Sequence, residues 1–351
     1  MILKLNSILV FSLVSFFLSW ILYPWYIKLL TKRKAGKQLR DTTMTWDEAS
    51  IFKQLHNHKK WTPTMWWGMF LLVMAIMVAA SFGIQELGRI NNTLVNRQET
   101  YILLVAFFGL GTLWLIDDLL NIRGKSGIKG VTAKMKLLRM FLFSWFICYW
   151  FGIRLGIDYF NLWPLMGELD VNLRWSVILF FLTVALVNAI NITDGLDGLV
   201  WWLMLVILPI LWLLTFLHQR YLATTLIGIL LGTLVAFLRF NINPAKIFMG
   251  DSWALALWWF VATLVYLINI KFGILIPFMI LFALFWIELT SSGLQIFWKK
   301  FFKKKLFPMA PFHHYLEYKK YPEHTIVMKF WFVQAILGAI VLIMIFYQFF
   351  A

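Results

Sequence analysis

Residues 199–217 read LVWWLMLVILPILWLLTFL, and after the short break HQRY the run LATTLIGILLGTLVAFLR follows at 222–239. Neither run alternates polar and apolar residues, and each is close to the roughly 20 residues that a helix needs to cross a bilayer. Over the whole chain, 62% of the residues are hydrophobic and 14% are charged, whereas soluble domains are about 25% charged. The sequence therefore predicts an all-α, polytopic membrane protein.

Further apolar runs extend this pattern to about ten transmembrane helices. They lie near 7–30, 64–85, 101–121, 137–154, 174–190, 253–270, 273–298 and 326–350, in addition to the two runs above. The first run has no small-residue cleavage site before about residue 30, so we expect a retained span rather than a signal peptide. Residues 1–351 are predicted to form a single transmembrane domain.

The basic residues indicate the orientation of these helices. A formal net charge of +16 could suggest nucleic acid, but Lys and Arg flank the apolar runs instead of forming one basic face, so we predict no nucleic-acid partner. They concentrate in 31–63 and 299–325. Because loops rich in Lys and Arg stay in the cytoplasm, where they also meet anionic membrane lipids, both termini are predicted on the extracytoplasmic side of an inner membrane.

Asp117 and Asp118 end the apolar run at 113–116, where the helix meets the membrane boundary. Ionisable groups at that depth are costly and are usually functional. The alternative is a helix end flanked by solvated carboxylates. A functional pair of carboxylates beside lipid binds a divalent cation or accepts a proton.

The segment NAINITDGLDG at 188–198 places Asn or Asp at every third position. Asn188, Asn191, Asp194 and Asp197 would share one face if the segment were helical, although its two glycines indicate local loosening. Oxygen ligands of this kind suit Mg²⁺, which retains waters and takes few carboxylates. A purely structural polar turn is the alternative, and it is an expensive one in an apolar setting.

Two later loops carry further polar and aromatic candidates. In NPAKIFMGD at 243–251, Phe248 precedes Asp251 by three residues; the aromatic ring either stacks on a nucleobase or anchors the chain at the interface. His313 and His314 could contact a phosphate or a nucleoside. They lack the spacing and the further ligands of a zinc site.

Taken together, these motifs resemble the phospho-N-acetylmuramoyl-pentapeptide transferases, within the polyprenyl-phosphate N-acetylhexosamine-1-phosphate transferases. The resemblance rests on WTPTM at 61–65, LIDD at 115–118, the 188–198 and 243–251 segments and PFHH at 311–314, in this order. It covers nearly the whole chain. It implies ten transmembrane helices and transfer of a phosphosugar from UDP-N-acetylmuramoyl-pentapeptide to undecaprenyl phosphate, with release of UMP and with Mg²⁺ as cofactor. The sequence leaves a homodimer open.

The resemblance also implies roles for individual residues. Asp251 and Asn191 would contact the metal or the diphosphate, and Asp117 or Asp118 would position the lipid phosphate. His313 and His314 match a histidine cluster, although Tyr315 stands where the family usually has a third histidine. The remaining matched positions are Asp194, Asp197 and Phe248 on the uridine side and Lys125, Lys134 and Lys136 in a basic loop.

Nine of the 20 tryptophans stand where the family pattern has glycine. They are Trp61, Trp66, Trp67, Trp114, Trp201, Trp202, Trp253, Trp258 and Trp259. An indole inserted at a close contact between membrane helices should overpack it. One hypothesis is that UGA codons read as glycine in the source organism were translated as tryptophan. The alternative is genuine tryptophan of an aromatic belt.

Two other functions compete with this one. A transferase specific for UDP-N-acetylglucosamine is the nearest, and the TPTM and PFHH stretches favour the muramoyl branch over it. A membrane transporter is the alternative from another class, since ten helices and intramembrane acids suit one. However, the acids gather at one predicted interface, and the sequence has no evident internal repeat.

Overall fold

The computed structural model describes residues 2–33, 62–64, 67–88, 90, 93–109, 111–112, 133–151, 159–163, 167–170, 173–248, 254–272 and 274–350. Within them the chain is helical apart from one small hairpin, in agreement with the predicted all-α membrane class. The helices are α1 (Ile2–Lys32), α3 (Trp67–Glu86), α4 (Gln98–Leu104), the π-helical turn η2 (Val105–Gly109), α6 (Ala133–Tyr149), α7 (Leu173–Thr193), α8 (Leu199–Leu217), α9 (Tyr221–Asn241), α10 (Ala254–Phe272), α11 (Leu275–Leu281), α12 (Ala283–Phe302), α13 (Phe312–Tyr318) and α14 (Glu323–Phe350).

Five of the described helices are long and apolar enough to cross a membrane, namely α1, α3, α8, α9 and α14. The count becomes six if α11 and α12, which meet at a bend of 68°, form one broken span. Shorter apolar helices occupy parts of the predicted spans near 101–121, 174–190 and 253–270. The multi-pass class is thus confirmed, while ten complete spans and the sides of the termini stay predictions.

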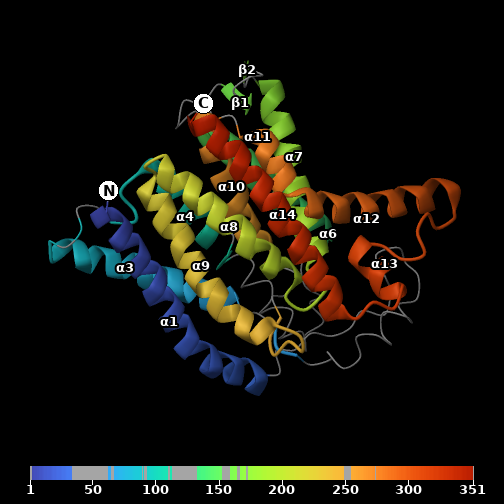
Figure 1. Cartoon of the computed structure of the whole chain (residues 1–351), viewed down its shortest axis with the longest axis horizontal. Helices are drawn as coiled ribbons and strands as arrows, with labels where there is room; N and C mark the ends of the chain where they lie inside the picture. Colours follow the sequence, from blue (N-terminus) through green and yellow to red (C-terminus); the bar gives the residue numbers. More distant parts are fainter. Residues whose placement is uncertain are drawn as a thin grey trace.

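Helix α9 lies at the centre of the bundle and packs along α1 (Figure 1). Gly228 and Gly232 lie one turn apart on α9, and a Cβ at either position would come within 2.3 Å of α1 atoms. Ser15 on α1 donates a hydrogen bond to the main-chain oxygen of Ile229 at 3.1 Å. Small residues spaced by four let membrane helices approach closely, which explains this tight contact.

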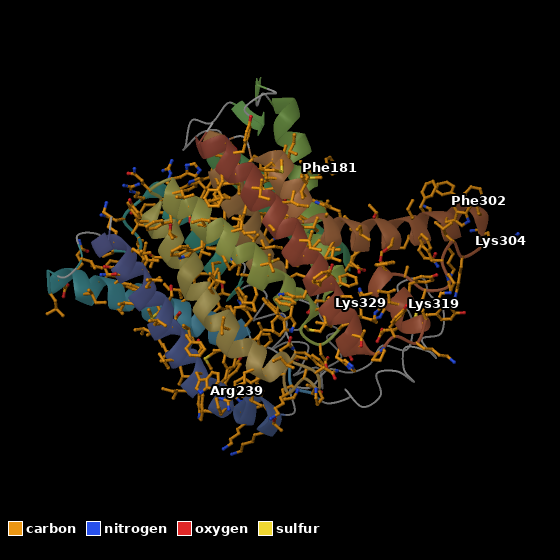
Figure 2. The ribbon with its side chains drawn as sticks, in the orientation of Figure 1. Phe181, Arg239, Phe302, Lys304, Lys319 and Lys329 are labelled. Atoms are coloured by element: carbon orange, nitrogen blue, oxygen red, sulfur yellow. The ribbon has the colours of Figure 1, made fainter. Side chains whose placement is uncertain are left out.

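Both termini lie toward the upper part of Figure 1, whereas the ends of α1, α7 and α9 and the start of α14 gather at the lower part. Several described basic residues lie with the second group, and others lie at the tip of α12 (Figure 2). Figure 2 shows Arg239, Lys319 and Lys329 in the lower part and Lys304 at the tip of α12, while Phe181 lies toward the opposite end. Near the N-terminus, Lys4 lies 4.4 Å from the ring centre of Tyr221. The charge asymmetry expected from the sequence is therefore present in three dimensions.

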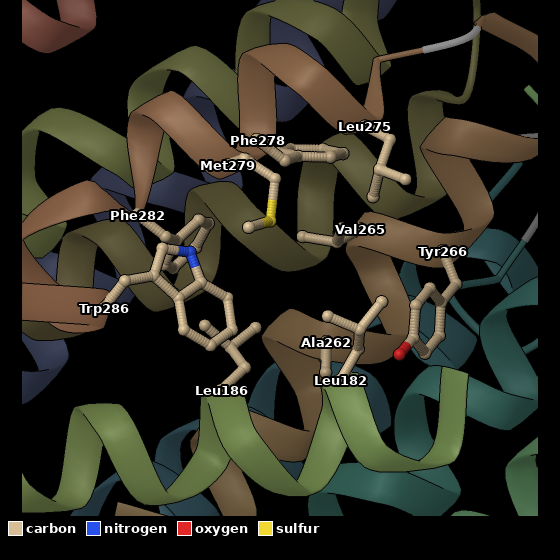
Figure 3. Close-up of a pocket in the computed structure, with 10 residues that line it drawn as sticks. All are labelled: Leu182, Leu186, Ala262, Val265, Tyr266, Leu275, Phe278, Met279, Phe282 and Trp286. Carbon is tan, nitrogen blue, oxygen red and sulfur yellow. The ribbon is translucent and has the colours of Figure 1, made fainter. Parts of the chain in front are cut away.

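Where α11 meets α12, an apolar cavity opens between these helices, α7 and α10 (Figure 3). It is lined by Leu182, Leu186, Ala262, Val265, Tyr266, Leu275, Phe278, Met279, Phe282 and Trp286. Beyond the bend, α12 projects sideways from the bundle (Figure 1). Its outer surface carries exposed Phe297, Phe301 and Phe302, which is the composition of a surface in contact with lipid.

A short hairpin connects α6 to α7. Strands β1 (Tyr159–Trp163) and β2 (Gly167–Asp170) pair antiparallel, with an irregularity between Asn161 and Trp163. The hairpin lies beside the C-terminal end of α14 in Figure 1, away from the lower loops. It is too short to change the fold class, and it places no polar candidate residue near the others.

Three of the tryptophans at expected glycine positions are the largest fully buried side chains described: Trp67, Trp201 and Trp259. Each packs against a phenylalanine; for example, the ring centres of Trp67 and Phe107 are 4.7 Å apart. Among the described residues, no acceptor meets the buried indole nitrogen of Trp259. Leaving a buried donor unpaired costs about 1–3 kcal/mol, so this position carries a penalty that glycine would not. The codon hypothesis stays a prediction.

Candidate functional site

The turn after α7 carries the first group of predicted site residues. Asn188 and Asn191 lie in the last turns of the helix, which ends at Thr193. The shared helical face therefore extends only over these two residues, because Asp194 and Asp197 lie in the turn that follows. Gly198 has a φ of +76°, a left-handed conformation that favours glycine, and it starts α8. The loosening expected at the glycines is confirmed.

Asp197 joins this turn to the loop after α9. Its carboxylate is 4% exposed, and its Oδ2 accepts hydrogen bonds from the main-chain N–H of Ala245 at 3.0 Å and from the side-chain amide of Asn243 at 3.1 Å. A buried carboxylate that accepts two N–H groups is well stabilised. Asp197 thus fastens one predicted site loop to another.

Glu323, at the start of α14, completes this arrangement. Its Oε1 accepts the main-chain N–H of Asp197 at 2.6 Å, and its Oε2 accepts the second N–H of the Asn243 amide at 3.2 Å. The Asn243 amide therefore bridges two carboxylates that would otherwise repel each other. Sequence reasoning missed Glu323, which looks like an ordinary acidic residue in the first turn of a helix.

The loop after α9 is also tied to the stretch that precedes α3. The main-chain N–H of Phe248 donates to the carbonyl of Pro63 at 2.7 Å. From the other side, the Asn241 amide donates to the carbonyl of Ile247 at 2.8 Å. Phe248 itself is partly buried. Two motifs nearly 200 residues apart in the sequence, at 62–64 and 243–248, thus lie side by side.

His313 reaches the turn after α7 from the opposite side. It is fully buried, and its main-chain N–H and its ring Nδ1 both meet the carboxyl of Glu288 on α12, at 3.1 and 3.0 Å. Its other ring nitrogen, Nε2, is pressed against Gly195, where an added Cβ would lie 2.2 Å away. No hydrogen-bond partner for this Nε2 occurs among the described residues. A buried polar atom without a partner is rare in native structures and calls for a specific reason.

His314 follows directly and is held in a different way. Its Nδ1 lies 2.5 Å from Oε2 of Glu317, one turn further along α13, and its ring centre is 4.1 Å from that of His313. Both histidines therefore have a carboxylate that fixes the ring. Glu288 and Glu317 were not predicted, although Glu288 carried a signal, because it is an ionisable residue within the apolar run at 273–298.

The structure brings together only part of the predicted site. The turn at 194–198, Phe248 and His313 are joined by the contacts above, whereas Asp117, Asp118, Lys125 and Asp251 lie outside the described residues. The main chain of Lys134 and Lys136 belongs to α6. The contacts thus join the segments at 194–198, 243–248 and 311–314 and tie 62–64 to the second of them. That these segments form one functional site stays a prediction.

The residues present suit a magnesium ion in their chemistry. Asn191 and Asp194 are partly exposed and carry oxygen atoms, which are the ligands that Mg²⁺ prefers. Within the described part of the chain, no group of three or more His, Cys, Asp or Glu side chains is arranged to hold a metal. Metal binding by Asn191 and Asp251 stays a prediction.

Comparison with known proteins decides the family. Residues 100–269 match the family model of glycosyl transferase family 4. The phospho-N-acetylmuramoyl-pentapeptide-transferase of Petrotoga mobilis is 32% identical, over 94% of this chain and 96% of the relative. The chain belongs to the phospho-N-acetylmuramoyl-pentapeptide-transferase family. Proteins of the same name from Listeria monocytogenes serovar 1/2a and Clostridium acetobutylicum are 31% and 30% identical, and each alignment covers at least 93% of both chains.

Membership of the phospho-N-acetylmuramoyl-pentapeptide-transferase family confirms the resemblance drawn from the motifs. It makes the chain a membrane transferase and removes the transporter alternative. The relatives named above all belong to the muramoyl branch, as the TPTM and PFHH stretches indicated. The structure adds contacts that bring some of these motifs together at one end of the bundle.

Proposed function

We propose that this chain transfers phospho-N-acetylmuramoyl-pentapeptide from its UDP derivative to undecaprenyl phosphate. An oxygen of the lipid phosphate forms a bond to the phosphorus that carries the sugar. The bond from that phosphorus to UMP breaks, and UMP leaves with the electron pair. The products are UMP and a lipid-linked diphosphate sugar, the first lipid-linked intermediate of peptidoglycan. The lipid phosphate is already largely ionised near pH 7, so it needs positioning more than deprotonation.

One observation carries the proposal. Four family motifs that are distant in sequence are linked by direct contacts: the turn at 194–198 meets His313 through Gly195 and meets the 243–248 loop through Asp197, and that loop is bonded to Pro63. Independent structural features would not need to meet at one place. A group-transfer reaction does, because the donor diphosphate, the sugar and the acceptor must be held together.

The described residues would have separate roles in binding the donor and in holding the site together. Asp194 lies partly exposed on the turn, where its carboxylate would accept hydrogen bonds from the uridine. Phe248, also partly exposed, would offer a ring face for the base to stack on. Asp197 would act by holding the turn against the 243–248 loop, because its Oδ2 already accepts two N–H groups.

A magnesium ion would bind beside the diphosphate of the donor. We expect Asn191 and Asp251 to hold Mg²⁺, which when bound neutralises negative charge on the transferring phosphate. Asp117 or Asp118 would position the lipid phosphate, and Lys125, Lys134 and Lys136 would attract the phosphates. In each case the support is the matching family motif and the type of residue.

The apolar surface around the α11–α12 bend would contact part of the acceptor's hydrocarbon chain. The lining of the cavity there is almost wholly apolar, and the exposed phenylalanines of α12 continue beyond it. A polyprenyl chain has no polar groups to satisfy, so such a surface suits it. The reactive phosphate would then lie at the membrane boundary.

The same arrangement suggests the cellular setting. The turns that carry the site residues lie at the end of the bundle where Arg239, Lys319 and Lys329 also lie, away from the termini (Figures 1 and 2). Basic loops stay in the cytoplasm, so we propose a plasma-membrane enzyme whose site faces the cytoplasm, where nucleotide sugars are available. The dimer question stays open.

A donor comparison tests this proposal. Membranes that contain the chain are given undecaprenyl phosphate, Mg²⁺ and either UDP-N-acetylmuramoyl-pentapeptide or UDP-N-acetylglucosamine, and UMP release is followed. We expect turnover with the first donor only. Turnover with only the second would replace our substrate assignment with the N-acetylglucosamine branch. Membranes without the chain serve as the control.

A further inference from the structure

Glu288 is a fully buried acid in the first half of α12, inside the predicted apolar span at 273–298. Its two carboxyl oxygens meet one residue, His313: Oε1 accepts the main-chain N–H at 3.1 Å, and Oε2 lies 3.0 Å from ring Nδ1. An acid in such a helix is costly and calls for a specific role. The role must involve His313, because both oxygens point to it.

Two attachments fix the histidine ring in one orientation. The main-chain contact holds the backbone and the Nδ1 contact holds the imidazole, so the ring cannot rotate without losing the second bond. The opposite edge of the ring is then directed at the turn after α7, where Nε2 lies against Gly195. Glu288 therefore determines where Nε2 points.

When Glu288 is ionised, the same contact sets which ring nitrogen carries the proton. The main-chain N–H of His313 can only donate, so the Glu288 carboxyl must accept there. An ionised carboxylate accepts hydrogen bonds only, so Nδ1 must also donate to it. In a neutral imidazole this leaves Nε2 without a proton, as a hydrogen-bond acceptor.

We propose that Glu288 is a positioning residue of the transferase site. It holds His313 with the ring proton on Nδ1, so that the Nε2 edge of the ring packs against Gly195 and fixes the position of the 194–198 turn. The inference rests on the proposed function, because that function places the 194–198 turn in the transferase site. The complete burial of both residues supports it independently.

Glu288 also has a structural role, which must be separated from its positioning of the His313 ring. Glu288 also stabilises the start of α13 through the main-chain N–H of His313, and so does Ser291, whose Oγ accepts the N–H of Phe312 at 3.1 Å. Ser291→Ala removes that bond from the same helix start without touching the ring. It is the matched control for loosening of α13.

The direct test is the protonation of the His313 ring. The chain is labelled with ¹⁵N-histidine, placed in liposomes at pH 8 and measured by solid-state NMR; His313→Asn identifies the signal among the six histidines. We expect wild type and Ser291→Ala to carry the proton on Nδ1. Glu288→Gln presents an amide N–H to Nδ1 and should move the proton to Nε2. Any other pattern in wild type, or an unchanged ring in a folded Glu288→Gln, overturns the proposal.

Turnover provides the second readout. We expect Glu288→Gln to lower kcat by about 100-fold or more, as replacement of an orienting carboxylate by an amide does elsewhere, and Glu288→Asp to recover part of it. Glu288→Gln added to His313→Asn should cost little more than His313→Asn alone, because the two act as one unit. A full additional loss would contradict the coupling. The NMR result needs no turnover, so an inactive wild type would defeat the proposed function and leave this inference to be judged separately.

Discussion

Replacement of Gly195 by alanine tests whether the turn after α7 and α13 are as close as the structure has them. The new Cβ would lie 2.2 Å from Nε2, 3.0 Å from Cε1 and 3.2 Å from Cδ2 of His313. The ring cannot retreat easily, because Glu288 holds it at the main-chain nitrogen and at Nδ1. Overpacking of this kind costs about 1–3 kcal/mol, and Gly195→Ala should lose that much stability and most of its activity.

The assay is a double-mutant cycle. Thermal unfolding in detergent and UMP release are measured for wild type, Gly195→Ala, His313→Ala and the double variant. Removing the imidazole makes room for the new methyl group, so the double variant should be more stable than the two single losses predict, by about 1 kcal/mol or more. Additive losses, or a Gly195→Ala protein as stable as wild type, would refute the contact.

Three further predictions follow from other parts of the chain. Asn243→Ala should cost about 1–3 kcal/mol, because it leaves the carboxylates of buried Asp197 and half-buried Glu323 without their shared donor; an unchanged melting temperature would count against the network. Burial, and secondarily Arg220, lowers the pKa of His218 from 6.5 to about 4, so the folded chain binds fewer protons than the unfolded one between those values. The contribution of neutral His218 to the free energy of unfolding should therefore be fully present above pH 6.5 and be lost as the pH falls toward 4. The loss should be about 1–2 kcal/mol after allowance for partial exposure. His218→Gln should flatten that dependence in a pH series of melting curves. The gene should carry UGA at the codon for Trp201, and a UGG codon there would end the recoding hypothesis.

Much of the architecture was predictable from the sequence because it depends on local composition. An apolar run of membrane length has few alternatives to a helix, so α1, α8, α9 and α14 fall at the predicted positions. Gly195 and Gly198 marked the turn after α7 because glycine disfavours continued helix. The positions of the turns then put alternate loops at the same end of the bundle.

Specific partners could not be predicted in the same way. Asp197 looked like a substrate contact, but its neighbours Asn243 and Glu323 come from segments 46 and 126 residues away. The pairing of Glu288 with His313 depends on the direction of α12 after the 68° bend from α11. The bend falls at Phe282, and no glycine or proline occurs at the break to predict it. Contacts of this kind arise from tertiary packing, which leaves little local signal.

The central claim is that the turn at 194–198 and His313 belong to one transferase site. The most direct measurement is release of UMP by the purified chain from UDP-N-acetylmuramoyl-pentapeptide, with and without undecaprenyl phosphate and Mg²⁺, for wild type, Asn191→Ala and His313→Asn. We predict release that requires both the lipid and the metal, matches the lipid-linked product one to one, and falls at least 100-fold in either variant. Undiminished release in both variants would contradict the claim.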